Sequence, residues 1–345
     1  MPNRPPMDPL ATELITEDNF DAQRYLLACP DLADAYRDGL DPWTHFDAHG
    51  RHEGRQQLAG IPAVPPAARS PGATLCSIAR NEGPYLVEWI AFHRLMGFER
   101  IIIYSNDSDD GSDDLLDRLA ACGLIEHRIW PGVEGRSSQI SAYQDATVRC
   151  ETRWIAFLDL DEYLNLKDDA SIGGFLARFD PDVAAIALNW RLFGSAGLID
   201  HAPGLLTERF TRASPLDHPF SRQIKTIAVA SEIYRITAHR VRLMRGRYAD
   251  ASGAPLDPGR GFAPVRYERV QVNHYVLKSR AEFERKRSRG SGLRAVGDPM
   301  KFTHRDGSYF DDHDRNETVD DTILRWRPAL TGEIARIEAM LLASG

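Results

Sequence analysis

An apolar segment that ends in three carboxylates is the most chemically suggestive part of this chain of 345 residues. Residues 154–158 read Trp-Ile-Ala-Phe-Leu, and Asp159, Asp161 and Glu162 follow. We predict a buried strand that delivers acidic groups to a sheet edge. Since Asp159 and Asp161 are two residues apart, an extended backbone would point both side chains the same way. Such oxygen ligands suit Mg²⁺ or Mn²⁺, and a cation of this kind commonly holds a diphosphate. The segment therefore favours a metal-dependent enzyme of sugar-nucleotide chemistry.

The acidic cluster has two other interpretations. The carboxylates could be solvated charge at a strand end, but crowded carboxylates repel one another unless a cation neutralises them. A phosphatase that forms an aspartyl phosphate also begins from such a strand. That family carries Thr or Val shortly after the second aspartate, whereas this chain has Glu162-Tyr163-Leu164.

Short apolar runs alternate with amphipathic stretches from Ala73 onward. This alternation predicts an α/β domain with a mostly parallel sheet flanked by helices. Ligands bind such sheets at the carboxyl ends of the strands. We expect strands over 74–78, 100–104, 125–130, 154–158 and 184–190, and helices over 84–96, 112–121, 138–150 and 171–179.

Polar residues follow the first predicted strand, where a ligand would bind. Arg80, Asn81 and Glu82 could hold a nucleotide through side chains and backbone amides. The same residues could instead form a strand-to-helix turn with Asn81 as the helix cap.

Two further segments could reach the same ligand. Residues 105–111 follow the second strand, and they either form an acidic turn or place Asn106 or Asp107 near a base or ribose. Gln139 and Tyr143 lie four apart on one helix face, where they either contact the ligand or line the helix surface.

A histidine precedes a basic helix late in the chain. We predict a short strand ending at His274, and the pair Ser279 and Glu282 forms a capping box that opens a helix. His274 could be a third metal ligand or a packing histidine. Lys278 could meet phosphates. The basic residues of the helix could do so too; they are Arg285, Lys286, Arg287 and Arg289.

The chain divides into three parts by composition. Residues 1–57 predict a small helical module with a docking or packing role, and 58–72 form a Pro/Ala-rich linker. Residues 73–345 form the main domain with a C-terminal helical extension. Its last helix, 334–342, could pack back on the domain or make a homodimer contact.

Bulk composition excludes several classes of protein. The net charge of −8 argues against nucleic acid as a partner, and no apolar run is long enough for a membrane span. The N-terminus lacks the apolar core of a signal peptide. The four cysteines lie far apart, which argues against a zinc site and against a disulfide framework. We expect a cytoplasmic protein, with association at the inner face of the membrane as a variant of that location.

Taken together, these segments resemble glycosyltransferases of the GT-A type. They are most similar to bacterial glycosyltransferase family 2-like proteins related to glycosyltransferase family 92. The resemblance covers about residues 73–320. The similar segments are 78–82, 85–93, 104–108, 139–143, 154–163, 189–194 and 273–275.

The resemblance implies a nucleoside-diphosphate sugar as donor, for which we expect a UDP-sugar, and a glycan or lipid-linked acceptor. It also implies a DxD motif formed by Asp159 and Asp161, in which Asp161 touches Mn²⁺ or Mg²⁺ most directly and His274 is a further ligand. Ser105 departs from the family pattern, where an acidic residue is common. The implied donor contacts are Arg80, Asn81, Glu82, Asn106, Asp107, Gln139, Tyr143, Asp159 and Lys278.

An inverting transfer needs a carboxylate that deprotonates the acceptor hydroxyl. Glu208 and Asp217 are our candidates, because both lie downstream of the loop 193–197, where an acceptor could bind. Either could instead be a surface acid, and Arg209 could pair with Glu208.

Two other functions are weighed against transfer. A sugar-nucleotide-synthesising nucleotidyltransferase usually has a Gly-rich basic loop after the first strand, and residues 79–83 do not match it. A non-catalytic scaffold with a relic domain would not need the intact acidic motif.

Overall fold

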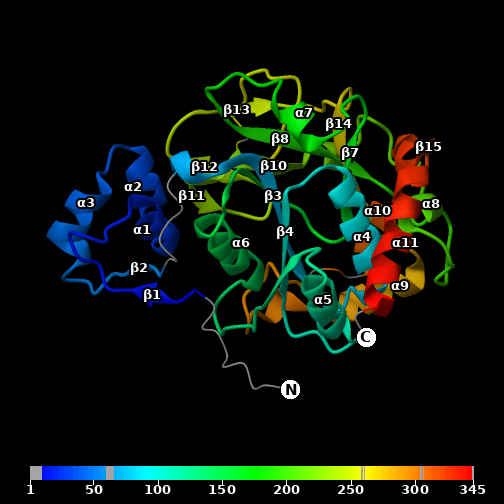
Figure 1. Cartoon of the computed structure of the whole chain (residues 1–345), viewed down its shortest axis with the longest axis horizontal. Coiled ribbons are helices and arrows are strands. Elements are labelled where there is room, and N and C mark those ends of the chain that lie inside the picture. Colours follow the sequence, from blue (N-terminus) through cyan, green and yellow to red (C-terminus); the bar gives the residue numbers. More distant parts are fainter. Residues whose placement is uncertain are drawn as a thin grey trace.

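A computed structural model describes residues 10–59, 66–257, 259, 261–303, 305 and 307–343. The N-terminal part is a small helical module that a two-stranded antiparallel sheet closes (Figure 1). Tyr25, Leu26 and Phe46 are buried in its core. Its elements are β1 (Thr12–Glu13), α1 (Ala22–Ala28), η1 (Pro30–Leu32), α2 (Ala33–Arg37), α3 (Pro42–His45), η2 (Phe46–Gly50) and β2 (Gln57–Leu58).

The module is docked on the main domain by hydrogen bonds that cross between them. Gln23 Nε2 donates to the Ile233 carbonyl at 2.7 Å, and Gln144 Nε2 donates to the Leu27 carbonyl at 2.8 Å. Leu58 belongs to β2 and the first long strand begins at Ser70, so both ends of the predicted linker 58–72 are structured. Part of that linker, 60–65, lies outside the described residues.

A nine-stranded sheet in the described chain forms the centre of the main domain, with the order β5-β4-β3-β6-β10-β8-β14-β7 and β13 beside β8. The first four strands are mutually parallel, whereas β10 runs antiparallel to both β6 and β8. The predicted α/β fold is confirmed. The strands are β3 (Ser70–Ala79), β4 (Arg100–Ser105), β5 (Glu126–Ile129), β6 (Thr152–Phe157), β7 (Glu162–Leu166), β8 (Val183–Leu192), β10 (Ile224–Val229), β13 (Arg247–Asp250) and β14 (Val270–His274).

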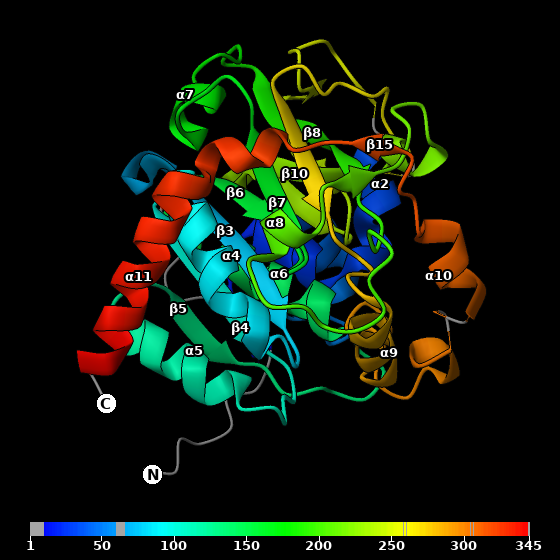
Figure 2. The ribbon, with the colours of Figure 1, turned by 90° about the vertical axis from the view of Figure 1, so that its right-hand side faces the viewer.

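Helices cover both faces of the sheet, with α4 and α11 on one side and α6 on the other (Figures 1 and 2). Strand β3 shows the reason, because Leu75 packs with the α4 side and Cys76 with the α6 side. The main helices are α4 (Gly83–Leu95), α5 (Ser112–Ala121), α6 (Ser138–Val148), α7 (Ile172–Leu176), α8 (Leu206–Arg209), α9 (Arg280–Ser288), α10 (Gly307–His313) and α11 (Arg327–Ala343).

Short elements complete the main domain. Two further two-stranded sheets pair β11 with β12 and β15 with β9. These elements are η3 (Pro66–Ala68), β9 (Arg212–Ala213), η4 (Pro219–Arg222), η5 (Ala230–Glu232), β11 (Ile233–Ile236), β12 (Val241–Leu243), η6 (Pro299–Lys301), β15 (Thr318–Val319) and η7 (Thr322–Trp326).

The C-terminal helix α11 packs back on the domain. Arg94 of α4 binds Glu333 at 3.0 Å, and Leu330, Ile337 and Leu341 of α11 are buried. This packing matches the first alternative for the predicted helix 334–342, and a homodimer stays a prediction. None of the helices in the described ranges combines the length and the apolar character that crossing a bilayer requires.

Each strand and helix predicted for the main domain is present, with ends shifted by a few residues, except that the last helix begins at Arg327 and not at 334. Strands β10 and β13 of the central sheet were not predicted. Strand β7 was also missed, because all its residues are buried and it shows no alternation of apolar and polar positions. It pairs with β14 through the register Glu162 opposite His274. This pairing brings the acidic cluster beside the late histidine.

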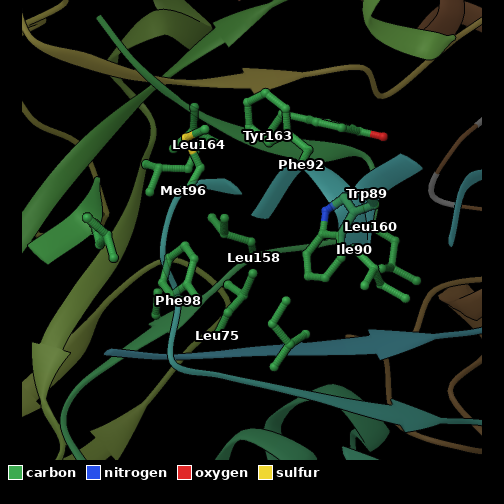
Figure 3. Packing of buried hydrophobic residues seen from close by; sticks show 14 of the residues in the cluster. Leu75, Trp89, Ile90, Phe92, Met96, Phe98, Leu158, Leu160, Tyr163 and Leu164 are labelled. Atoms are coloured by element: carbon green, nitrogen blue, oxygen red, sulfur yellow. The ribbon is translucent and has the colours of Figure 1, made fainter. Parts of the chain in front are cut away.

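Trp89 links the core to the acidic segment. Its ring lies wholly buried among α4, β7 and the segment after β6 (Figure 3). Its Nε1 donates to the Glu162 carbonyl at 2.8 Å. One side chain of α4 therefore contributes both apolar burial and a fixed hydrogen bond to the start of β7.

We expect Trp89→Ala to lower the free energy of unfolding by about 3–5 kcal/mol, because it removes a fully buried ring and leaves a cavity. Urea denaturation followed by far-UV circular dichroism measures the change. Leu342→Ala is the control, since that side chain is 83% exposed and the expected loss is under about 0.5 kcal/mol. Equal losses in the two variants would contradict this account of the core.

Candidate functional site

A cavity of about 180 Å³ lies at the sheet edge where β3, β4, β6, β8 and β14 end. Its position is the one expected for a ligand site in such a sheet. The predicted residues that line it are Arg80, Glu82, Asn106, Gln139, Asp159, Asp161 and His274. Lys286 and Arg289 of the basic helix, which we expected could meet phosphates, also line it. Other lining residues were not assigned to the site, among them Trp190, His239, Arg305 and Tyr309 and residues 290–293.

Asp159 and Asp161 lie in the turn between β6 and β7. Strand β6 ends at Phe157 and β7 begins at Glu162, so the two aspartates are not aligned by an extended strand as we predicted. Both aspartates line the cavity because the turn itself faces it. The Tyr275 N–H donates to the Asp161 carbonyl at 2.8 Å and fixes the turn against the end of β14.

The carboxylate of Asp159 is held by three side chains. Gln139 Nε2 and Tyr143 OH donate to its Oδ1 at 2.6 and 3.2 Å, and Lys225 Nζ donates to Oδ2 at 3.0 Å. Burial alone would raise the pKa of Asp159, but Lys225 outweighs it and holds the pKa below the usual value. Asp159 is thus a fixed anion, and Tyr143 acts on it from outside the cavity lining.

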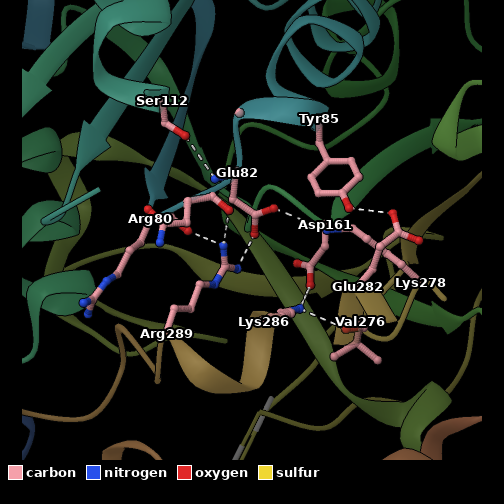
Figure 4. A network of polar contacts seen from close by, with 12 residues as sticks. Arg80, Glu82, Tyr85, Ser112, Asp161, Val276, Lys278, Glu282, Lys286 and Arg289 are labelled. Carbon is pink, nitrogen blue, oxygen red and sulfur yellow. Dashed lines mark hydrogen bonds and ion pairs between the residues drawn. The ribbon is translucent and has the colours of Figure 1, made fainter. Parts of the chain in front are cut away.

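The carboxylate of Asp161 is buried and faces two cations or potential cations. Lys286 Nζ contacts its Oδ2 directly, and His274 Nε2 lies 3.7 Å from the same oxygen (Figure 4 for Lys286). Burial opposes the charge of Asp161, yet Lys286 and His274 hold its pKa well below the usual range. Burial lowers the pKa of Lys286 to about 8 and that of His274 to about 3, although Asp161 acts in the opposite sense on both. At neutral pH this histidine is a neutral imidazole, the form that binds metals.

Lys225 was missed by the sequence reasoning. It lies on β10, is 1% exposed in its side chain, and also pairs with Glu162 Oε2 at 3.1 Å. The scarcity of lysine was the available signal: the chain has five lysines, and the structure buries three of them, Lys225, Lys278 and Lys286, beside this site. Lys225 and Lys286 supply the neutralisation of the crowded carboxylates that we had assigned to a metal ion alone.

The loop after β3 is tied to helix α9. Glu82 is buried, pairs with Arg289, and lies 3.3 Å from Lys278 Nζ (Figure 4). Arg289 also donates to the carbonyls of Arg80 and Asn81. Burial would raise the pKa of Glu82, but Arg289 and Lys278 outweigh it and lower the pKa. Lys278 lies over the Tyr85 ring and does not line the cavity.

Two predicted donor contacts serve the backbone of the rim. Asn81 has a φ of 52° and exchanges hydrogen bonds with Asp109, outside the cavity lining. Asp107 has a φ of 54° and accepts from the Gly132 N–H at 3.3 Å. Asn106 lines the cavity, and its Nδ2 donates to the Trp130 carbonyl at 3.0 Å.

The two predicted general bases do not line this cavity. Glu208 pairs with Arg327 of α11, and Asp217 is exposed after β9. Arg209 does not pair with Glu208; its Nη1 and Nη2 donate to the two carboxylate oxygens of Glu282 in α9, each at 3.1 Å. We chose these two acids because they follow the loop 193–197 in the sequence, and that order does not determine where their side chains point.

A family model described as Glycosyltransferase family 92 matches residues 75–324, more than two thirds of the chain and all the strands around the cavity. The chain belongs to glycosyltransferase family 92. This membership confirms the resemblance to GT-A type glycosyltransferases.

Known family 92 proteins are similar to this chain over part of their length. One from Ricinus communis is 27% identical over 204 residues, which cover 57% of this chain and 35% of that protein. One from Arabidopsis thaliana is 29% identical over 138 residues, which cover 34% of this chain and 22% of that protein. The matched part thus spans about a third or less of these relatives.

Solved structures superpose only in part. Glucosyl-3-phosphoglycerate synthase from Mycobacterium tuberculosis, in complex with Mn²⁺, UDP and glucosyl-3-phosphoglycerate, gives a TM-score of 0.29 at 14% identity over 48% of this chain and 59% of that chain. The family assignment rests on the family model.

The donor set of this family 92 domain fits a divalent cation that has few protein ligands. No group of three His, Cys, Asp or Glu side chains is arranged to hold a metal among the described residues. Asp161 and His274 do offer an oxygen and a neutral nitrogen 3.7 Å apart, and Nδ1 of His274 is buried with no partner in the described chain. Mg²⁺ and related ions are commonly held by one or two carboxylates plus substrate phosphates.

Helix α9 is fixed by the predicted capping box. Ser279 Oγ accepts from the Glu282 N–H at 3.3 Å and Glu282 Oε2 accepts from the Ser279 N–H at 3.0 Å. Tyr85 OH donates to the same carboxylate at 2.6 Å, and Arg209 binds it. Burial would raise the pKa of Glu282, but Arg209 and Tyr85 hold it well below the usual value.

We expect Glu282→Gln to lower stability more at pH 7 than at pH 3. The folded-state pKa of Glu282 is depressed, so its contribution is present above the unfolded value of about 4.3 and is lost as the pH falls toward the folded value. Urea denaturation across that range measures the difference from the unsubstituted protein. Glu284→Gln, on the exposed side of the same helix, is the control. A difference for Glu282→Gln that is constant with pH would refute this role.

Proposed function

We propose that this chain transfers a sugar from a nucleoside-diphosphate sugar, of which a UDP-sugar is our expectation, to a hydroxyl of a glycan or lipid-linked acceptor. The observation that carries the proposal is the cavity at the carboxyl ends of the strands. It combines an acidic turn and a neutral histidine with the cationic side chains of Lys286, Arg289 and Arg305. Family membership supports a transferase over a nucleotidyltransferase or a scaffold protein.

Different groups of the cavity lining suit different parts of such a donor. Lys286, Arg289 and Arg305 offer cationic donors, which favour the oxygens of a diphosphate. Arg80 and Asn106 line the cavity at the ends of β3 and β4, where a nucleoside would meet the loops. Charge and position therefore favour a diphosphate near α9 with its nucleoside toward β3 and β4.

Asp161 and His274 would hold Mn²⁺ or Mg²⁺, with Asp159 as a further candidate ligand. The cation would supply Lewis-acid stabilisation of the negative charge that develops on the diphosphate as it leaves. The protein's part is to keep these donors fixed. Tyr275 anchors the turn of Asp161, and Lys225, Gln139 and Tyr143 orient Asp159.

An inverting reaction would need an acceptor hydroxyl on the face of the sugar opposite the diphosphate, and a base to take its proton. Glu208 and Asp217 stay predictions for that base. The pairing of Glu208 with Arg327 and the exposure of Asp217 give neither one an advantage.

We expect Asp161→Asn to lower kcat/KM at least about 100-fold, because it removes the anion that helps to hold the cation while it keeps the size of the side chain. A panel of nucleotide sugars, with and without Mn²⁺, first identifies the donor through release of the nucleoside diphosphate. Thermal unfolding checks that the variant is folded.

Asp38→Asn, an exposed change in the N-terminal module, is the matched control and should leave kcat/KM unchanged. A folded Asp161→Asn protein with activity within about threefold of the unsubstituted protein would remove Asp161 from the mechanism.

A further inference from the structure

Lys286 occupies the place at Asp161 where a divalent cation would bind. Its Nζ contacts Asp161 Oδ2 and donates to the Val276 carbonyl at 3.1 Å, and its side chain is only 8% exposed (Figure 4). We propose that Lys286 is a placeholder cation: it neutralises Asp161 while the donor site is empty, and it must leave Asp161 when the metal ion and the diphosphate bind. This inference rests on the proposed function.

The first reason for this proposal is the geometry around a single oxygen atom, Oδ2 of Asp161. Asp161 Oδ2 receives the Lys286 ammonium and also faces His274 Nε2 at 3.7 Å. A metal ion shared by Asp161 and His274 would bind this same oxygen. An ammonium and a dication cannot both lie against one carboxylate oxygen without strong repulsion, because their charges have the same sign.

The second reason is the balance of charge around the turn. The other aspartate of the turn is already matched, since Lys225 binds Asp159 at 3.0 Å. Asp161 is thus the carboxylate of the turn whose partner lies on a separate helix, α9. A dication that enters without an anion would add positive charge beside Lys286, Lys225 and Arg289. A nucleoside diphosphate brings the compensating negative charge, so metal and nucleotide should bind with strong positive coupling.

The third reason is the position of Lys286 in the cavity. It lies in the last turn of α9 and lines the cavity together with Arg289 and Arg305. A lysine side chain is a flexible four-carbon stem that carries a point charge. A change of rotamer can therefore take the ammonium from Asp161 to a phosphate oxygen within the same cavity, with no movement of the backbone. Lys286 would then contribute to diphosphate binding after it has yielded its place.

The test is Mn²⁺ binding, measured by electron paramagnetic resonance of the free ion with and without UDP. For the unsubstituted protein we expect UDP to tighten Mn²⁺ binding at least about tenfold. Lys286→Met should bind Mn²⁺ without UDP at least about tenfold more tightly than the unsubstituted protein, because the competing charge is gone. In this variant UDP should tighten Mn²⁺ binding by a smaller factor than in the unsubstituted protein, because the phosphate oxygens still bind the ion but no longer have to compensate for a displaced ammonium.

Thermal unfolding gives a second readout. Lys286→Met leaves Asp161 buried without its cation, so the variant should melt at a lower temperature without Mn²⁺ and recover when Mn²⁺ is added. The unsubstituted protein should gain less from Mn²⁺ alone. Lys286→Gln keeps a hydrogen-bond donor without the charge and serves if the methionine variant folds poorly. Lys167→Met, at the far end of β7, removes the same charge away from the site and should leave the Mn²⁺ response unchanged.

The outcomes separate the two proposals. One outcome is that UDP-dependent Mn²⁺ binding is found in the unsubstituted protein, but neither Lys286 variant binds Mn²⁺ more tightly without UDP. In that case the proposal that Lys286 is a placeholder cation is wrong, and the proposed metal site stands. If neither the unsubstituted protein nor either variant binds Mn²⁺ with UDP present, the metal part of the proposed function fails together with the placeholder.

Discussion

The ion pairing of the turn between β6 and β7 is the constraint on which the site depends. Two aspartates and Glu162 are crowded into four residues, and they are buried or half-buried at a sheet edge. Lys225 from β10 and Lys286 from α9 make this arrangement tolerable, because buried charges persist only when they are paired. Each lysine comes from an element that follows the turn by many residues. The site is complete only when the whole domain has folded.

The sheet topology explains how these partners meet. Strand β10 runs antiparallel between β6 and β8, so its first residues reach the edge where the parallel strands end. Lys225 is the second residue of β10 and therefore stands beside Asp159. On the other side β14 is parallel to β8 and antiparallel to β7, and its last residue, His274, lies opposite the start of β7. In a purely parallel sheet His274 would still reach this edge, because β14 is parallel to β8, but the first residues of β10, and Lys225 with them, would lie at the opposite edge.

Much of this was accessible from the sequence, and the misses have physical causes. Apolar alternation and capping signals located the helices and the parallel strands, and an acidic motif at a strand end marked the cavity. Our prediction for that motif was wrong in one respect. Asp159 and Asp161 lie in a turn and not on an extended strand, so tertiary contacts orient them. Lys225 was missed because strand pairing across the chain cannot be read from local pattern. Nothing in the sequence near Glu208 indicates that Arg327, on the last helix, binds it.

Helix α6 lies between the N-terminal module and the ligand cavity. Gln144 holds the module through the Leu27 carbonyl, while Gln139 and Tyr143 of the same helix grip Asp159. The docking of the module and the orientation of the aspartate therefore both depend on side chains of one helix, within residues 139–144.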